Sequence, residues 1–139
     1  MDIKSKQRLV GWTPLTDLEN KTPSFGDIAI HSSSYQSLSI TLPYEEGELR
    51  IEFKDARSFM TSWDGDPNPI LSFEEAASRP SDLLKIEASR WLSSAHFSLD
   101  IESSFQGSDK PWEHFCIVAC ERSLHVAARD DIEALWVSE

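Results

Sequence analysis

The chain has 139 residues, of which 40% are hydrophobic and 10% are aromatic. This length suits one domain whose core needs no metal or disulfide, and the aromatic content excludes a disordered acidic tail. Asp and Glu number 24 against 13 Lys and Arg, giving a net charge of −11 that repels phosphate backbones and argues against nucleic-acid binding.

Targeting and membrane signals are missing from the sequence. The N-terminal residues lack the apolar run of a signal peptide, and no stretch approaches the roughly 18 apolar residues of a membrane-spanning helix. Two cysteines do not form a disulfide framework in a chain of this size. We therefore expect a cytoplasmic protein with no membrane partner, forming a single domain over residues 1–139.

The first part of the chain predicts an irregular arm followed by strands. Residues 1–24 show no sustained period, and four apolar residues could anchor this arm to the fold: Val10, Trp12, Leu15 and Leu18. Residues 25–31 are the first strand candidate.

Residues 38–42 and 49–53 alternate apolar and polar side chains, with the apolar set at Leu38, Ile40, Leu42, Leu49, Ile51 and Phe53. Two such runs around the Gly-containing loop 43–48 predict an antiparallel hairpin with one solvated face. Residues 59–63 are expected to add a third strand to this meander.

The middle of the chain predicts a long connection and then the main helix. Residues 64–81 carry three prolines and one glycine, with room for a helical turn at residues 73–78. Residues 83–87 resemble a short strand, after which Ser89 suits the N-cap of a helix running to Leu99. The alternative is one continuous helix over residues 82–95, since Leu84, Ala88, Trp91, Leu92 and Ala95 also share a stripe, and of the two we prefer strand followed by helix.

The most apolar stretch, residues 112–137, predicts a central hairpin covered on both faces. If Arg122 and Ser123 form its turn, one face carries Phe115, Ile117, Ala119, Leu124, Val126 and Ala128. Cys120 then lies opposite His125. Residues 132–137 are expected to dock through Leu135 and Trp136.

Four residues of this stretch are candidates for chemistry: His114, Cys116, Cys120 and His125. On a strand, Cys116 and Cys120 are four positions apart, or roughly 13 Å at about 3.3 Å per residue, too far for one zinc ion or a disulfide. A nucleophilic Cys120 beside His125 lacks a third, orienting residue. We therefore predict structural cysteines, no catalytic or metal-binding residue and no cofactor.

The loop after Trp63 partly matches a calcium-binding loop. Asp64, Asp66 and Asn68 stand at alternate positions and Glu75 follows at the right distance. Pro69 occupies the position that needs glycine, so the pattern is better explained as turn chemistry.

Acidic residues cluster around loops, where a solvated surface is the usual explanation. The functional alternative is a patch that docks a basic protein through acidic residues and aromatic anchors. The residues predicted for this role are Tyr44, Glu45, Glu46, Glu48, Trp63, Asp64, Asp66, Trp112, Asp130 and Asp131.

Several segments resemble small, mostly uncharacterised bacterial single-domain α+β proteins. They are residues 86–92 (IEASRWL), the pair His114-Phe115 and residues 124–128 (LHVAA); residues 49–53 and 63–65 match in pattern only. Some proteins of this kind resemble immunity proteins, which neutralise a partner toxin by binding it. The resemblance implies a fold and transfers no functional residue.

These patterns predict an α+β fold, with a mostly antiparallel sheet of six to eight strands and one main helix against it. The expected function is that of a small acidic bacterial protein that binds a basic partner, as an immunity-type or antitoxin-type inhibitor. One alternative is an enzyme or ligand-binding module with a pocket between sheet and helix, using His96, His114, Cys120 and His125. Another is a structural subunit or homodimer.

Overall fold

The computed structural model describes residues 7–16, 18, 21, 23–24, 28–32, 37–63, 70–93, 111–119 and 122–138. This part of the chain forms nine strands and one short helix: β1 (Arg8–Gly11), β2 (Ala29–Ser32), β3 (Leu38–Tyr44), β4 (Gly47–Phe53), β5 (Ala56–Trp63), α1 (Phe73–Ala77), β6 (Leu83–Glu87), β7 (Glu113–Ala119), β8 (Arg122–Ala128) and β9 (Ile132–Ser138).

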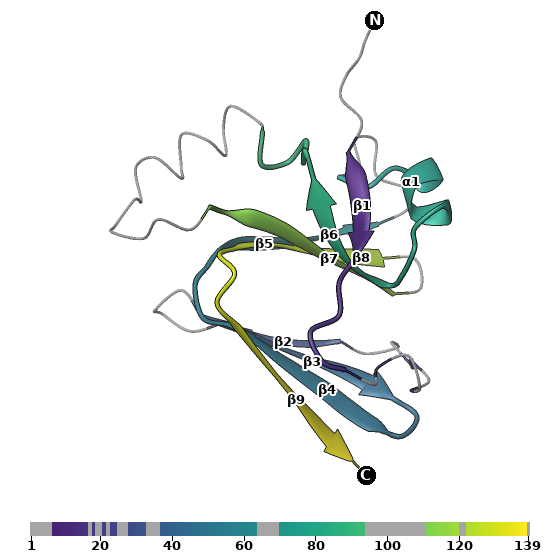
Figure 1. Ribbon diagram of the computed structural model, residues 1–139, viewed down its shortest axis with the longest axis vertical. Helices are drawn as coiled ribbons and strands as arrows, with labels where there is room; N and C mark the ends of the chain where they lie inside the picture. The colour runs from purple at the N-terminus through teal and green to yellow at the C-terminus, as the bar shows by residue number, and fades with distance from the viewer. Residues whose placement is uncertain are drawn as a thin grey trace, which may run out of the picture.

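The strands form two antiparallel sheets. One has the order β1-β6-β7-β8-β5 and the other the order β2-β3-β4-β9. Figure 1 shows them as two layers that meet on one side, where β4 continues into β5 and β8 into β9. The expectation of one α+β sheet with a main helix is therefore wrong, since the only helix in the described residues is α1, five residues long.

One long bent ladder joins the two sheets. β4 pairs with β9 from Gly47 opposite Ser138 to Phe53 opposite Ile132, and β5 then pairs with β8. At the bend, the N–H of Lys54 donates to the Asp131 carbonyl at 2.9 Å, and the N–H of Arg129 to the Asp55 carbonyl at 2.9 Å. The third strand of the expected meander exists as β5, but this bend carries it away from β4 and onto β8.

The predicted hairpin of residues 38–42 and 49–53 is confirmed as β3 and β4. Its alternating apolar side chains are all buried, which is why the pattern was informative: Leu38, Ile40, Leu42, Leu49, Ile51 and Phe53. The turn is shorter than expected, since Pro43 and Tyr44 belong to β3 and only Glu45 and Glu46 connect the strands.

The main core lies between the two sheets. Phe53 from one sheet and Phe115 from the other have ring centroids 5.3 Å apart, and Trp12 from the N-terminal segment packs on Phe115 at 4.9 Å. Leu15 and Leu18 also pack against this core. The expectation that apolar residues anchor the N-terminal segment holds for these three residues, and Arg8–Gly11 adds a strand, β1, paired with β6.

The central hairpin exists, but its turn was misplaced. Arg122 pairs with Ala119 and Ser123 with Val118, so both belong to the ladder of β7 and β8. Cys116, and not Cys120, lies opposite His125, and Cys120 lies outside the described residues. The register differs from the expected one by four residues, an even number, so the predicted inner face remains correct for Phe115, Ile117, Leu124, Val126 and Ala128.

A second apolar layer covers the outer face of the five-stranded sheet. Leu71, Leu84, Ile86, Cys116 and Val118 are buried there, with Ala76 of α1 packed against them. The predicted helical turn at residues 73–78 is confirmed as α1, which begins at a capping box formed by Ser72 and Glu75.

The residues described after Ser89, 90–93, form a turn and not the start of the expected main helix. Residues 83–87 form β6, so one continuous helix over residues 82–95 is wrong. Ser89 does cap a turn, because its Oγ accepts the N–H of Leu92 at 3.0 Å. Residues 94–100, and His96 with them, lie outside the described part of the chain.

The last strand docks through one of its two predicted anchors. Trp136 packs edge-on against Tyr44, with ring centroids 5.3 Å apart. Leu135 is 58% exposed and points to solvent, because β9 is an edge strand and its alternate residues face outward.

Within the described residues, no helix is long and apolar enough to cross a membrane.

Candidate functional site

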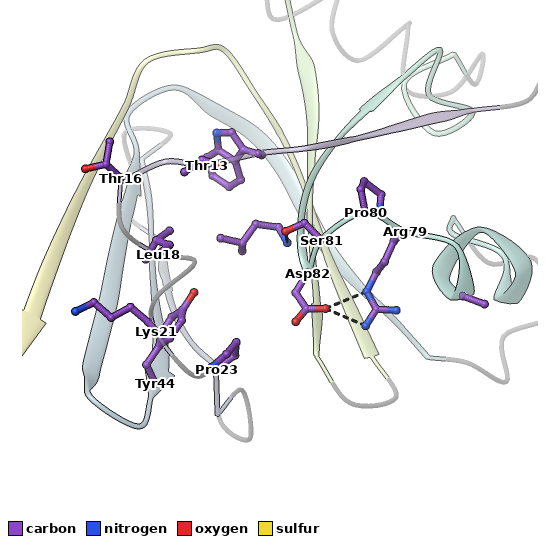
Figure 2. A pocket seen from close by; sticks show the side chains of 13 residues that line it. Thr13, Thr16, Leu18, Lys21, Pro23, Tyr44, Arg79, Pro80, Ser81 and Asp82 are labelled. Carbon is purple, nitrogen blue, oxygen red and sulfur yellow. Dashed lines mark hydrogen bonds and ion pairs between the residues drawn. The ribbon is translucent and has the colours of Figure 1, made fainter.

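A cleft of about 960 Å³ opens between the two sheets (Figure 2). We call it the inter-sheet cleft. The N-terminal segment and the end of β3 form one side of it, and the connection from α1 into β6 forms the other. Its lining residues are Trp12, Thr13, Thr16, Leu18, Lys21, Pro23, Tyr44, Ala77, Arg79, Pro80, Ser81, Asp82 and Leu83.

An ion pair between Arg79 and Asp82 forms one wall of the inter-sheet cleft. Nε and Nη2 of Arg79 donate to the same carboxylate oxygen, Oδ1 of Asp82, at 3.0 and 2.9 Å. Nη1 of Arg79 donates to the carbonyl of Ala76 at 2.7 Å. The second carboxylate oxygen, Oδ2, is on the side of the cleft that faces Tyr44 (Figure 2).

Tyr44 forms the opposite wall. It is 7% exposed and ends β3, where it lies opposite Gly47 of β4. Its ring packs against the ring of Trp136. Burial, and secondarily the negative charge of Asp82, raises the pKa of the Tyr44 phenol above its usual value. The phenol therefore stays neutral and can both donate and accept hydrogen bonds.

Lys21 lines the cleft but directs its ammonium group elsewhere. Nζ lies 4.8 Å from the ring centroid of Trp136, within the range of a cation–π interaction. Figure 2 shows the end of this side chain pointing away from Asp82.

Four of the residues predicted for partner binding lie near the inter-sheet cleft. Tyr44 lines it, and Glu45 and Glu46 form the exposed turn that follows, which we call the acidic turn. Glu48 is next on β4, where its Oε2 pairs with Nη2 of Arg50 at 2.6 Å. Tyr44 and Glu48 therefore face opposite sides of the hairpin, since Tyr44 pairs with Gly47 and Glu48 with Pro43, and Glu48 does not line the cleft.

Three other predicted residues lie at the opposite end of the four-stranded sheet. Asp130 and Asp131 are exposed at the bend between β8 and β9. Trp112 is close to this bend, with the guanidinium of Arg129 4.1 Å from its ring centroid. The length of β4, roughly 20 Å at about 3.3 Å per residue, separates this group from the acidic turn.

The remaining predicted residues are Trp63, Asp64 and Asp66. The backbone of Trp63 ends β5, while its side chain, Asp64 and Asp66 lie outside the described residues. Asp82 is the residue that the sequence did not single out. Its only signal was a spacing of three residues from Arg79, which is too common to mark a site.

His114 and His125 form a buried hydrogen-bonded chain with two serines. Nδ1 of His114 lies 2.7 Å from Ser89 Oγ, Nε2 of His114 lies 2.8 Å from Nδ1 of His125, and Nε2 of His125 lies 2.7 Å from Ser123 Oγ. Burial, with a smaller effect of His125, lowers the pKa of His114 to about 3, and burial lowers the pKa of His125 to about 4. All four ring nitrogens are occupied, so this pair is structural.

The described residues support neither a zinc site among the His and Cys residues of the central hairpin nor a calcium site in the loop after Trp63. No group of three or more His, Cys, Asp or Glu side chains in this part of the chain could hold a metal ion. Cys116 is fully buried, and burial raises the pKa of its thiol to about 12. Glu75 is bound through both oxygens to Arg90 at 2.8 and 2.9 Å, and Asp64, Asp66 and Asn68 lie outside the described residues.

Comparisons with known proteins add no relative. No protein-family model, no curated protein and no solved structure matches this chain. The geometry of the chain itself is therefore the basis for proposing a function.

Proposed function

We propose that this protein binds a basic protein partner and that the inter-sheet cleft receives a Lys or Arg side chain of that partner. The observation that supports this most directly is the position of Asp82. Arg79 uses only Oδ1 of this carboxylate, which leaves Oδ2 facing Tyr44 across the cleft. An ionised carboxylate accepts several hydrogen bonds, so Asp82 can hold Arg79 and a guest cation together.

The two cations of the cleft are already engaged. Arg79 donates to Asp82 and to the backbone of Ala76, and Lys21 lies over Trp136. They oppose a cationic guest at short range. The acidic turn beside the cleft and the net charge of −11 offset this opposition and attract a basic partner from a distance.

Aromatic surface in the cleft suits a guanidinium or an ammonium group. The ring of Tyr44 and part of Trp12 line it, and cations bind favourably over aromatic faces. A side chain inserted here would meet one carboxylate oxygen, one neutral hydroxyl and two aromatic rings. Such a combination confers specificity for Arg and Lys over neutral side chains of similar size.

The specific form of this proposal is an immunity-type inhibitor, which covers the basic active-site cleft of an enzyme. Charge would accelerate the encounter, and the inserted side chain would set the residence time. The first partner to test is the product of any adjacent gene, captured at about 50 mM and about 500 mM salt. Capture that does not weaken at high salt would contradict a charge-led mechanism.

A direct test of the cleft needs no known partner. Isotope-labelled protein is titrated with a tri-arginine peptide amide and followed by backbone amide NMR shifts. The matched control is a tri-citrulline peptide amide, which has nearly the same shape and no side-chain charge. We expect saturable shifts around Tyr44 and Asp82 with arginine only. Shifts confined to Asp130 and Asp131, or equal shifts with citrulline, would refute the cleft as the site.

Substitutions separate the cleft from general charge. Asp82→Asn removes the carboxylate, and Tyr44→Phe removes only the hydroxyl and retains the packing on Trp136. We expect each to weaken tri-arginine binding at least about threefold, the loss of one charged or polar hydrogen bond. Asp131→Asn makes the same change of charge at the far end of the sheet and should leave binding within a factor of two.

A further inference from the structure

We infer that the partner carries a large apolar side chain two residues away from its Arg or Lys, and that this side chain enters a second pocket beside the inter-sheet cleft. The second pocket has a volume of about 280 Å³ and lies between the N-terminal segment and β9. We call it the side pocket. The inference rests on the proposed function, because it extends the site that receives the basic residue.

The side pocket and the inter-sheet cleft are neighbours. Thr16, Leu18 and Lys21 line both of them. The N–H of Lys21 donates to the carbonyl of Leu18 at 2.9 Å, which holds these residues in a turn between the two pockets. Figure 2 shows all three on the side of the cleft opposite Asp82. A peptide that leaves the cleft over this turn therefore reaches the side pocket next.

Most of the lining of the side pocket is apolar. Four of its residues are half-buried and pack against the main core from behind: Leu15, Leu18, Ala134 and Trp136. Leu135 lies at its rim and is 58% exposed, so covering it with another apolar group is favourable. A volume of this size is near the lower limit for a small-molecule site and suits a single side chain.

Charge determines which side chain suits the side pocket. Among the described residues that line it, only Lys21 is charged, and its Nζ lies 4.8 Å from the ring centroid of Trp136. This ammonium group repels a second Arg or Lys. An acidic side chain would lose its hydration among apolar groups and be repelled by the net charge of −11. A neutral apolar side chain such as Leu or Met incurs neither cost.

The arrangement of two adjacent pockets sets the spacing of the two partner residues. In an extended peptide, side chains at positions i and i+2 point the same way and are roughly 6.6 Å apart at about 3.3 Å per residue. A basic and an apolar residue separated by one residue can therefore occupy the two pockets together. Either chain direction satisfies this spacing, so the test includes both orders.

Five-residue peptides with acetyl and amide ends test the inference by NMR titration. The parent is Gly-Gly-Arg-Gly-Gly, and Leu replaces either its first or its last glycine. We expect one leucine peptide to bind at least about fivefold more tightly than the parent and to add shifts at Ala134, Leu135 and Trp136. This gain should be equal at about 50 and about 500 mM salt, while the affinity of every peptide falls. An equal gain with Glu in place of Leu would overturn the apolar assignment.

Variants test the location of the leucine contact. Leu135→Asn should reduce the gain from leucine to less than about twofold and leave the binding of the parent peptide unchanged. Met60→Gln alters another exposed apolar residue, in the five-stranded sheet, and should retain the full gain. Parent shifts at Tyr44 and Asp82 without a gain from leucine would overturn this inference alone. If no arginine peptide shifts Tyr44 and Asp82, the proposed function fails as well.

Discussion

Nε2 of His114 lies 2.8 Å from Nδ1 of His125, on the diagonal between β7 and β8. Each neutral imidazole has one N–H and one acceptor nitrogen, so the chain from Ser89 to Ser123 is satisfied with both rings neutral. Two protonated rings would bring two N–H groups against each other. The outer face of the five-stranded sheet therefore depends on histidines that carry no charge.

Acid should destabilise the fold through these two histidines. Their pKa values of about 3 and 4 lie below the unfolded value of 6.5, so between these limits the unfolded state binds more protons than the folded state. The contribution of these two histidines to the free energy of unfolding is constant above about pH 7. It falls as the pH decreases, by about 2 kcal/mol for each histidine at pH 5. Urea denaturation from pH 7.5 to 5 measures this slope.

Substituting one histidine should reduce both stability and the acid slope. His125→Leu leaves the ring of His114 and the hydroxyl of Ser123 without their partner, which costs about 1–3 kcal/mol at pH 7.5. The loss between pH 7.5 and 5 should fall to about half. His31→Gln, at an exposed position on β2, is the control and should retain the full slope. An unchanged slope in His125→Leu would contradict the assignment.

Arg90 should matter more to stability than an exposed arginine. It donates to both oxygens of Glu75, and its backbone N–H donates to Gln7 Oε1 at 2.8 Å, which links α1, the turn after β6 and the N-terminal segment. Burial raises the pKa of Glu75, but the bonds from Arg90 and Ser72 more than compensate, so the net shift is downward. We expect Arg90→Ala to cost about 2 kcal/mol in urea denaturation.

The control for Arg90 is Arg8. It pairs with Glu87 at 3.4 Å, and the two side chains are 76% and 55% exposed. Exposed pairs of this kind contribute about 0–1 kcal/mol, so Arg8→Ala should have a small effect. Equal losses in the two variants would show that the Glu75 contact adds no more than surface charge.

Gly47 should tolerate no side chain. A Cβ there would clash with the carbonyl oxygen of Val137 and stand 2.9 Å from the Cα of Ser138, both backbone atoms of the paired strand β9. Gly47→Ala must therefore shift β9, and we expect a loss of about 2 kcal/mol or more in thermal or urea unfolding. Gly11→Ala is the matched control, since its Cβ would meet Ser81 Cβ at an ordinary 3.7 Å.

Cys116 should react only when the protein opens. It is fully buried and its thiol has a pKa of about 12, so almost no thiolate forms at neutral pH. In a Cys120→Ser variant, labelling by a thiol reagent at pH 7.5 should be at least about a thousandfold slower in buffer than in urea, reflecting the rarity of the open state. Rapid labelling of the folded variant would show that the outer layer is not closed.

Local patterns in the sequence predicted the strands and the pairing of β3 with β4, but not the partners that are distant in the sequence. The alternation at Leu38, Ile40 and Leu42 identified β3, because each residue's side depends only on the backbone period. The bend at Lys54 and Asp55 is set by pairing with distant residues near Asp131, which no local signal reveals. That bend changed one sheet into two and removed β5 from the meander.

In the candidate site, too, the residues set by local patterns were predicted, and the residue set by a long-range contact was not. The acidic turn and Tyr44 could be located from the sequence because they join two well-patterned strands. Asp82 could not, since its importance comes from facing Tyr44, a residue from the other sheet (Figure 2). The turn between β7 and β8 was misplaced because both faces of this hairpin are apolar, so alternation gave no penalty for a register shifted by an even number of residues.

The bent ladder also bears on how the chain is made. Gly47 pairs with Ser138, and Trp63 with Arg122, so β4 and β5 leave the ribosome long before the strands that complete their sheets. Pairing of strands that are so distant in the sequence is slow, and a strand edge that is still unpaired is prone to associate with other chains. We expect the nascent chain to remain protease-sensitive until β9 emerges, and the refolding of the complete chain to be slow for its length.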